Sequence, residues 1–308
     1  MKPKVILIGK GQQCNVVMYN LRCQGIYEVA CICDSKIADK DEKIDGIPLE
    51  EWENYSVDCM KRLESKYNTN LFFIAFGNMK TRKKVFEYCV SNGWESVNII
   101  HPNAVVSPNA KLGIGILIEA GCLITPNPII GNNVVINTGS QVNHDNIVAD
   151  HVYIASGVIL SGGVNIGENT LLDDGVIITL GKSVGENSLI GAGAIVTKDI
   201  PSDSVAAGIP ARVVCTLDEY YRKRKAKAVG EAKQYARNLY NYRGTRPTVE
   251  DFWEEFALFY HEDENYPDTF VQRIKNVQMP GELYDEFVKN NQPIYASFED
   301  FLDDALKG

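Results

Sequence analysis

Residues 112–130 read LGIGILIEAGCLITPNPII, and an aliphatic residue stands at every sixth position from Leu112 to Ile130. The same step gives seventeen Ile, Val or Leu residues without a break from Ile100 to Val196. A short fixed period is typical of a repeat architecture whose units stack on one another. The sequence therefore predicts a left-handed parallel β-helix. Each hexapeptide would form one short strand and a corner, three hexapeptides would form a coil, and the recurring aliphatic side chain would point inward.

A second period of eighteen residues supports this coil length. Small residues follow the inward aliphatic once per coil, at Gly113, Gly131, Ala149, Gly167 and Gly185. We expect a small residue at this position because the corner turns tightly.

Before the repeat, apolar strands alternate with helical segments, which predicts a small Rossmann-like α/β domain over residues 1–98 with its ligands at the carboxyl ends of parallel strands. The expected strands are Lys4–Ile8, Glu28–Cys33 ending at Asp34, Asn70–Phe76 and Val97–Ile100, and the expected helices run to about Gln24 and over Lys80–Ser91. The β-helix would occupy residues 99–214.

Residues 215–308 combine polar helical stretches with many aromatic residues and predict a C-terminal α-helical extension. Thr248 is a candidate cap for a helix through PTVEDFWEEFALFY, residues 247–260, with Glu250 and Asp251 in its first turn. The fold class is therefore mixed, with three successive domains.

Composition narrows the range of partners. The net charge of −9 argues against a nucleic-acid partner, and no stretch is long and apolar enough for membrane insertion or resembles a signal peptide. We expect a cytoplasmic protein.

Its eight cysteines include no CxxC pair and are expected to be free and mostly buried. Cys31 and Cys33 are expected on opposite faces of a strand, poorly placed for a shared metal or disulfide.

The segment NTGSQVNHDN, residues 137–146, places His144 and Asp145 just after the inward Val142, at a corner. An imidazole beside a carboxylate can act as a general base, since the carboxylate stabilises the imidazolium that forms. A solvated histidine in a polar turn is an equally good reading of the same residues.

Residues 1 to about 214 resemble the sialic-acid O-acetyltransferase and bacillosamine-precursor N-acetyltransferase group of sugar acyltransferases. The resemblance is carried by five segments: IGKG (8–11), AFGN (75–78), HPNAVVSPNAKLG (101–113), INTGSQVNHD (136–145) and IGAGAIVTKDIPSDSVAAGIPARVV (190–214). It implies acetyl-CoA, or another acyl-CoA, as co-substrate, a nucleotide-linked sugar as partner, a homotrimer with the cofactor between adjacent prisms, and no metal.

The resemblance also implies roles for individual residues. His144 matches the catalytic base, Asp145 its acidic neighbour, and Gly162 the glycine whose N–H approaches the thioester carbonyl and the cofactor. The implied cofactor contacts are completed by Tyr153, Asp174 and Ala192. The implied positions for the nucleotide-linked sugar are Gly9, Gly11, Gln12, Gln13, Asp34, Ser35, Gly77, Asn78 and, near the acceptor sugar, Asn137. Gln13 and Cys14 stand where relatives usually carry His-Gly, and Tyr153 stands where some carry histidine.

These features predict an acyl-CoA-dependent N-acyltransferase acting on a nucleotide-linked amino-deoxysugar. Two alternatives remain open from the sequence. One is O-acetylation of a sugar hydroxyl, which the same base would serve. The other is a non-catalytic trimeric scaffold or binding protein that keeps the prism alone.

Overall fold

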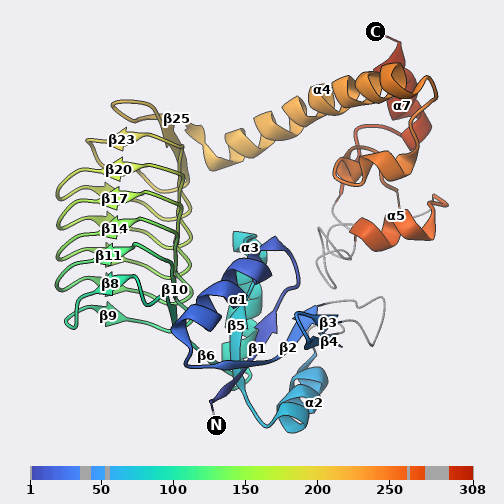
Figure 1. The fold of residues 1–308 in the computed structure, drawn as a ribbon. Helices are drawn as coiled ribbons and strands as arrows, with labels where there is room; N and C mark the ends of the chain where they lie inside the picture. The colour runs from blue at the N-terminus through green and yellow to red at the C-terminus, as the bar shows by residue number, and fades with distance from the viewer. Residues whose placement is uncertain (1, 35–42, 53–55, 262–263, 275–290, 308) are drawn as a thin grey trace. The chain divides into compact units, whose positions relative to one another are not determined.

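The computed structural model describes residues 2–34, 43–52, 56–261, 264–274 and 291–307 (Figure 1). The chain divides into two compact units. The larger contains most of the chain up to Tyr220, and the smaller contains Tyr221–Gly308 together with two short N-terminal segments. None of the helices in the described ranges has the length and apolar character needed to cross a bilayer.

The N-terminal part of the larger unit is a six-stranded sheet in the order β3-β4-β2-β1-β5-β6. Strands β2, β1, β5 and β6 run parallel, and β3 and β4 form an antiparallel pair. The elements are β1 (Lys4–Ile8), α1 (Gln12–Gln24), β2 (Glu28–Asp34), β3 (Lys43–Ile44), β4 (Ile47–Glu51), α2 (Val57–Tyr67), β5 (Leu71–Ile74), α3 (Met79–Ser91) and β6 (Glu95–Ser96). The Rossmann-like prediction is confirmed, since β1, α1, β2, β5 and α3 lie close to their predicted ranges.

Two expectations for this region are wrong. No single strand covers Val97–Ile100: β6 ends at Ser96 and closes the α/β sheet, and β7 (Ile99–Ile100) is the first rung of the prism. Cys31 and Cys33 do not point to opposite faces, because residues two apart in a strand share a face. Their sulfur atoms lie 3.7 Å apart, and all eight cysteines are free.

Seventeen two-residue strands form the walls of a triangular prism. They are β7 (Ile99–Ile100), β8 (Val105–Val106), β9 (Lys111–Leu112), β10 (Leu117–Ile118), β11 (Leu123–Ile124), β12 (Ile129–Ile130), β13 (Val135–Ile136), β14 (Gln141–Val142), β15 (Ile147–Val148), β16 (Tyr153–Ile154), β17 (Ile159–Leu160), β18 (Asn165–Ile166), β19 (Leu171–Leu172), β20 (Ile177–Ile178), β21 (Ser183–Val184), β22 (Leu189–Ile190) and β23 (Ile195–Val196).

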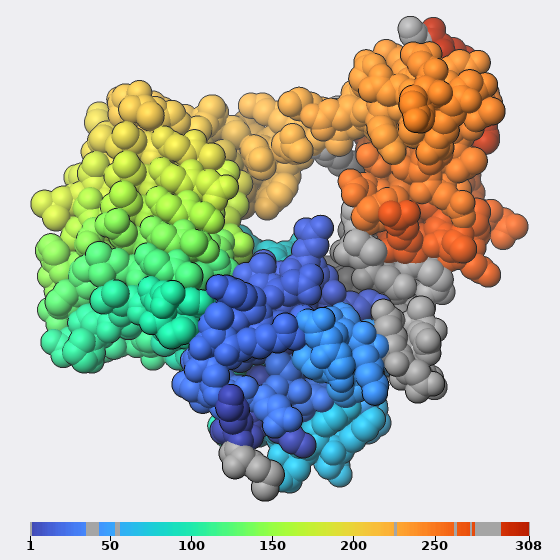
Figure 2. All heavy atoms as spheres, in the orientation of Figure 1, coloured from blue at the N-terminus to red at the C-terminus, as the bar shows by residue number. Residues whose placement is uncertain are grey.

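From β10 to β20, each strand of the prism pairs in parallel with the strands eighteen residues before and after it. Val142, for example, lies opposite Ile124 on one side and Leu160 on the other. From Ile118 to Val196 the second residue of each strand is buried, which confirms the predicted inward column. On the face that Figure 2 shows, the green-to-yellow coils pack against one another without a gap.

The three walls are named here by their strands. Sheet 1 contains β7, β10, β13, β16, β19 and β22 and is closed by β24 (Ser204–Ala207) and the antiparallel β25 (Arg212–Thr216). Sheet 2 contains β8, β11, β14, β17, β20 and β23, and sheet 3 contains β9, β12, β15, β18 and β21. The chain visits them in the order 1, 2, 3, so each coil has corners 1–2, 2–3 and 3–1.

A left-handed residue makes each corner from the one after β9 to the one after β22. Every sixth residue from Gly115 to Gly193 has φ between 53° and 73°. Glycine or asparagine holds this position except at Asp145 and His151. Residues other than glycine, asparagine, aspartate and histidine rarely adopt this left-handed backbone conformation, so the turn restricts which residues can stand there.

The column Gly113, Gly131, Gly167 and Gly185 has a different cause from the one expected. These glycines at corner 3–1 do not have positive φ. The backbone of the next coil approaches them instead: a Cβ atom at Gly167 would lie 2.7 Å from the carbonyl carbon of Gly185. Glycine is therefore required in this column because adjacent coils are closely spaced there, and the turn itself does not require it.

The smaller unit has a core rich in aromatic side chains. Its elements are α4 (Leu217–Arg243), the 3₁₀ helices η2 (Val249–Phe252) and η3 (Phe256–Leu258), α5 (Asp268–Arg273) and α7 (Phe298–Leu306). The continuous helix expected over residues 247–260 is wrong, because this stretch forms the two short 3₁₀ helices. The Thr248 N–H donates to the Asp251 carboxylate at 3.0 Å, as a cap should. Phe252, Phe256 and Phe259 all enter the aromatic core.

We predict that Gly167→Ala destabilises the prism by about 1–3 kcal/mol, the usual cost of overpacking, because the added methyl group meets the backbone of the next coil. Chemical denaturation followed by circular dichroism would measure this change.

The matched control is Gly230→Ala, within α4, where an added Cβ meets nothing within 4 Å. This change should be stabilising by about 0.5–1 kcal/mol, because alanine favours a helix interior. Equal stability of the Gly167→Ala variant and the natural protein would contradict the close-approach explanation.

Candidate active site

His144 and Asp145 occupy corner 2–3, between β14 and β15. The Nδ1 atom of His144 lies 2.9 Å from Oδ2 of Asp145, and both side chains are 59% exposed. Asp145 is itself the left-handed residue of this corner, with φ 59°. The turn that ends β14 therefore sets the direction of the carboxylate, and the carboxylate sets the direction of the imidazole.

The hydrogen bonds on Asp145 keep it ionised. The bond from His144, followed by one from Asn127 at 3.2 Å, lowers the pKa of the Asp145 carboxyl. An ionised carboxylate only accepts hydrogen bonds, so Nδ1 of His144 carries the hydrogen and Nε2 is left as the basic atom. Sequence reasoning missed Asn127, although it stands eighteen residues before Asp145 and so occupies the same place one coil earlier.

Gly162 lies one coil above His144 at corner 2–3. A Cβ atom there would overlap Cε1 and Nε2 of His144, so the imidazole lies directly against this residue. The Gly163 N–H donates to the His144 carbonyl at 2.9 Å, which joins the two coils at this point. Among the residues that the structure describes, the Gly162 N–H has no hydrogen-bond partner. Histidine ring and free amide thus lie side by side at one exposed corner.

Asn137 and Tyr153 lie together on a different wall. Asn137 follows β13 and Tyr153 is in β16, both in sheet 1, and the Asn137 Nδ2 atom donates to the Tyr153 hydroxyl at 2.9 Å. The structure thus joins a residue expected near the sugar to one expected near the cofactor.

Asp174 and Ala192 share corner 1–2, exposed and eighteen residues apart. Asp174 accepts a hydrogen bond from the Ser156 N–H at 3.0 Å. A single chain therefore does not bring these two residues to His144, which lies at corner 2–3. The expected catalytic residues therefore lie at one edge of the prism, and two of the expected cofactor residues, Asp174 and Ala192, lie at another.

The positions expected for the nucleotide follow adjacent parallel strands. Gly9 and Gly11 follow β1, and Gly11 precedes the first turn of α1, which contains Gln12 and Gln13. Gly77 and Asn78 follow β5, and Asn78 caps α3 by accepting from the Thr81 N–H at 3.0 Å. Since β5 pairs with β1, these two helix N-termini lie at one edge of the sheet, where anions bind well. Asp34 ends β2, and Ser35 lies outside the described residues.

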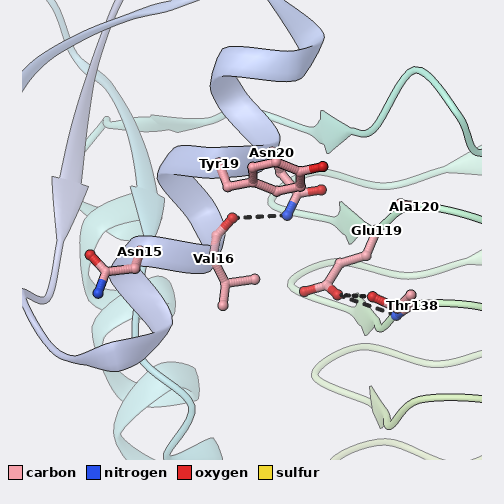
Figure 3. A pocket seen from close by; sticks show the side chains of 7 residues that line it. All are labelled: Asn15, Val16, Tyr19, Asn20, Glu119, Ala120 and Thr138. Carbon is pink, nitrogen blue, oxygen red and sulfur yellow. Dashed lines mark hydrogen bonds between the residues drawn. The ribbon is translucent and has the colours of Figure 1, made fainter.

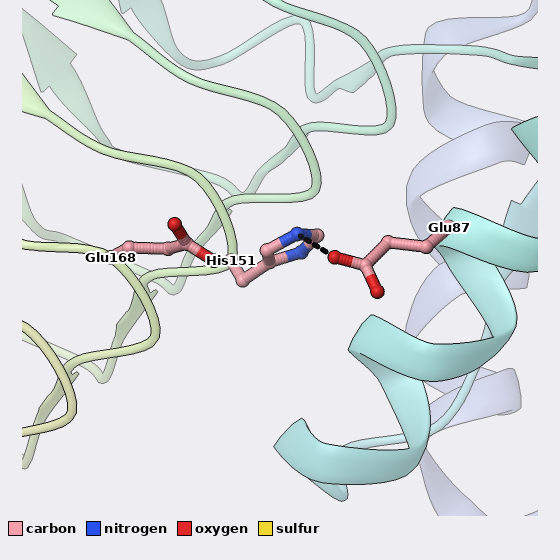
Figure 4. Close-up of side chains that lie close together, drawn as sticks. All are labelled: Glu87, His151 and Glu168. Carbon is pink, nitrogen blue, oxygen red and sulfur yellow. Dashed lines mark ion pairs between the residues drawn. The ribbon is translucent and has the colours of Figure 1, made fainter.

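A cluster of ionisable residues joins α3 to corner 3–1 (Figure 4). Glu87, His151 and Glu168 bring ligand atoms within 4.8 Å of one another. The Lys83 ammonium lies 2.5 Å from Glu168 and 3.9 Å from Glu87, so a cation already balances these carboxylates. His151 lies 3.5 Å from Glu87, and burial lowers the pKa of its imidazole. We therefore interpret this cluster as a contact between the α/β sheet and the prism.

Comparisons with known proteins show which proteins this chain is similar to. Residues 4–89 match the family described as the PglD N-terminal domain. Over 89 residues the chain is 32% identical to GDP-perosamine N-acetyltransferase of Escherichia coli O157:H7, across 29% of this chain and 39% of that protein. The alignment thus spans well under half the length of this curated relative.

Two solved structures extend the similarity to the prism. A histidine-to-alanine variant of GDP-perosamine N-acetyltransferase from Caulobacter crescentus, in complex with CoA and GDP-perosamine, is 32% identical with a TM-score of 0.63, over 69% of this chain and 97% of that chain. The acetyltransferase domain of PglB from Neisseria gonorrhoeae, in complex with acetyl coenzyme A, is 27% identical with a TM-score of 0.61, over 70% of this chain and all of that one.

The chain belongs to the left-handed β-helix sugar acyltransferases, enzymes that use an acyl-CoA. Within that family, the relatives named above include N-acetyltransferases of a nucleotide-linked amino sugar.

We predict that Asp145→Asn separates catalysis from folding. Asparagine already stands at the same corner position at 127, 133, 169 and 187, so the turn should be retained. Loss of the ionised acceptor should lower kcat/KM for acyl transfer by about 100-fold, within the usual contribution of an assisted general base. Steady-state kinetics and thermal unfolding would measure the two effects.

Asp145→Val is the contrasting variant. A β-branched residue at positive φ is strained by about 1–2 kcal/mol, so this change should reduce stability as well as activity. If Asp145→Asn unfolded as easily as Asp145→Val, the carboxylate rather than the backbone would hold the corner.

Proposed function

We propose that this protein transfers the acetyl group of acetyl-CoA to the amine of a nucleotide-linked amino-deoxysugar. The observation that carries the proposal is corner 2–3, where His144 is oriented by Asp145 and lies against Gly162, whose N–H has no hydrogen-bond partner among the described residues. The named relatives, in complex with CoA and GDP-perosamine or with acetyl coenzyme A, support the choice of substrates.

In the proposed reaction, the sugar amine attacks the thioester carbonyl carbon while His144 Nε2 takes a proton from the nitrogen. The Gly162 N–H donates to the oxygen on which negative charge develops. The carbon–sulfur bond then breaks, and the imidazolium returns the proton to the CoA thiolate. The products are the N-acetyl sugar and CoA, and Asp145 stabilises the imidazolium throughout.

The division of the site between two corners supports a homotrimer. Corner 2–3 of one chain supplies His144 and Gly162, and corner 1–2 of a second chain would supply Asp174 and Ala192. The outward side chains of the walls supply apolar contact area, since Leu123, Ile129 and Ile147 are 36%, 45% and 48% exposed. Burial of such a surface is the usual reason for association. In a closed trimer, each of the three clefts between adjacent chains would have one edge from each of the two chains that form it.

We predict that His144→Ala lowers acetyl transfer to a nucleotide-linked amino sugar at least about 100-fold, since the variant has no general base. Light scattering should still give three times the mass of one chain. Turnover within a few-fold of the natural protein would contradict the role of the histidine. Assay of the matching hydroxyl sugar in parallel distinguishes N- from O-acetylation.

Mixed trimers test the division of the site. His144→Ala removes the base, and Ala192→Trp is designed to block the cofactor edge, so each variant alone should be inactive. Refolding the two together should restore about a quarter of the natural activity, because random mixing gives that share of clefts with both edges intact. Mixtures as inactive as the separate variants would place the whole site within one chain.

A further inference from the structure

A cavity of about 400 Å³ lies between α1 and the first coils of the prism (Figure 3). Asn15, Val16, Tyr19 and Asn20 line it from α1, and Glu119, Ala120 and Thr138 line it from corner 1–2. Its size is in the range of small-molecule sites. Among the described residues, no lysine, arginine or histidine lines it, so these walls do not favour a phosphate group.

Glu119 is the distinctive residue of this cavity. Its side chain is 8% exposed, which is unusual for a carboxylate. One oxygen, Oε2, accepts hydrogen bonds from the Thr138 N–H at 3.2 Å and from the Thr138 hydroxyl at 2.7 Å. The other oxygen points away from Thr138 toward α1 (Figure 3). The carboxylate is therefore held in place by one oxygen while the other faces the cavity.

The α1 wall adds an aromatic surface and a second acceptor. The Tyr19 ring is stacked on His101 with centroids 5.6 Å apart, yet Tyr19 remains 57% exposed. Asn20 is 2% exposed, and its Nδ2 atom donates to the Val16 carbonyl at 2.8 Å. Its carboxamide oxygen has no partner among the described residues. The cavity thus combines hydrogen-bond acceptors with a ring face.

We infer that this cavity holds the sugar ring of the nucleotide-linked substrate, with Glu119 accepting hydrogen bonds from ring hydroxyls and Tyr19 packing against the ring carbons. The inference rests on the proposed function and makes Glu119 a specificity-determining residue. A site that accepts hydrogen bonds from substrate hydroxyls discriminates strongly against analogues that lack them, because its own acceptors are then left unpaired.

The place of the cavity fits this role. It begins one turn after Gln12, where the positive end of α1 can face a diphosphate. Its other wall contains Ala120 and Thr138, which are the lower members of the column that continues to Asp174 and Ala192. A nucleotide sugar lying along α1 would therefore place its sugar at the edge where the proposed trimer adds His144 of a second chain.

The decisive variant is Glu119→Gln. A glutamine oxygen can still accept from Thr138, while the group facing the cavity changes from an acceptor to a donor. Titration calorimetry with GDP-perosamine, a UDP-linked 4-amino-deoxysugar, GDP and UDP would measure the effect. We expect this variant to bind the nucleotide sugar about 10- to 100-fold more weakly than the natural protein does, with little change in its affinity for the free nucleoside diphosphate. Glu186→Gln, an exposed corner residue, is the matched control and should change neither affinity.

A second pair of variants tests the ring contact independently of Glu119. Tyr19→Phe should keep nearly the natural affinity for the nucleotide sugar, whereas Tyr19→Ala should weaken it several-fold because the stacking surface is lost. Circular dichroism and the mass in solution would verify that each variant remains folded.

Three results would overturn the inference. Glu119→Gln could leave the affinity for the nucleotide sugar unchanged, or it could weaken binding of the nucleotide sugar and of the nucleoside diphosphate equally. The natural protein could also bind neither nucleotide sugar more tightly than the corresponding nucleoside diphosphate. Failure of the proposed function has a different signature. In that case the natural protein would bind a nucleotide sugar in a Glu119-dependent way but transfer no acetyl group to it.

Discussion

Parallel pairing of strands eighteen residues apart is the constraint on which the rest of this molecule depends. Each coil can bury its aliphatic column only if the next coil repeats it in register, as Ile124, Val142 and Leu160 do. That register places a left-handed residue at every sixth position and aligns corner residues in columns. The candidate catalytic groups are members of such columns, so their mutual positions follow from the walls of the prism.

Much of this architecture follows from the sequence, because a period of six in aliphatic residues has one simple structural explanation. The same reasoning gave the wrong cause for the column that contains Gly167, since the approach of a neighbouring coil cannot be seen in a single repeat. It also predicted a continuous helix where Phe252 and Phe256 enter an aromatic core through short turns. Both errors concern tertiary packing, which local patterns do not encode.

In the candidate site, too, some features could be predicted from the sequence and others needed the structure. His144 and Asp145 are adjacent in sequence, so their pairing could be predicted, and the family resemblance supplied Gly162. The support from Asn127 needed the register between coils. That Asp174 and His144 lie apart could be recognised only once each residue had been assigned to a corner of the prism. Glu119 had no signal in the sequence, because a lone glutamate in a repeat normally faces solvent, whereas the structure buries it between Thr138 and α1.

One consequence of the coil repeat concerns the spacing of the chemistry. Neighbouring strands in any sheet are separated by about 4.8 Å, so two groups eighteen residues apart at one corner are held about one such step from each other. The backbones of His144, which carries the imidazole, and Gly162, whose amide would donate to the developing charge, are related in this way. Their separation is thus a property of the peptide hydrogen bond. Natural or engineered changes in the number of coils can lengthen the scaffold by whole steps and leave that gap unaltered.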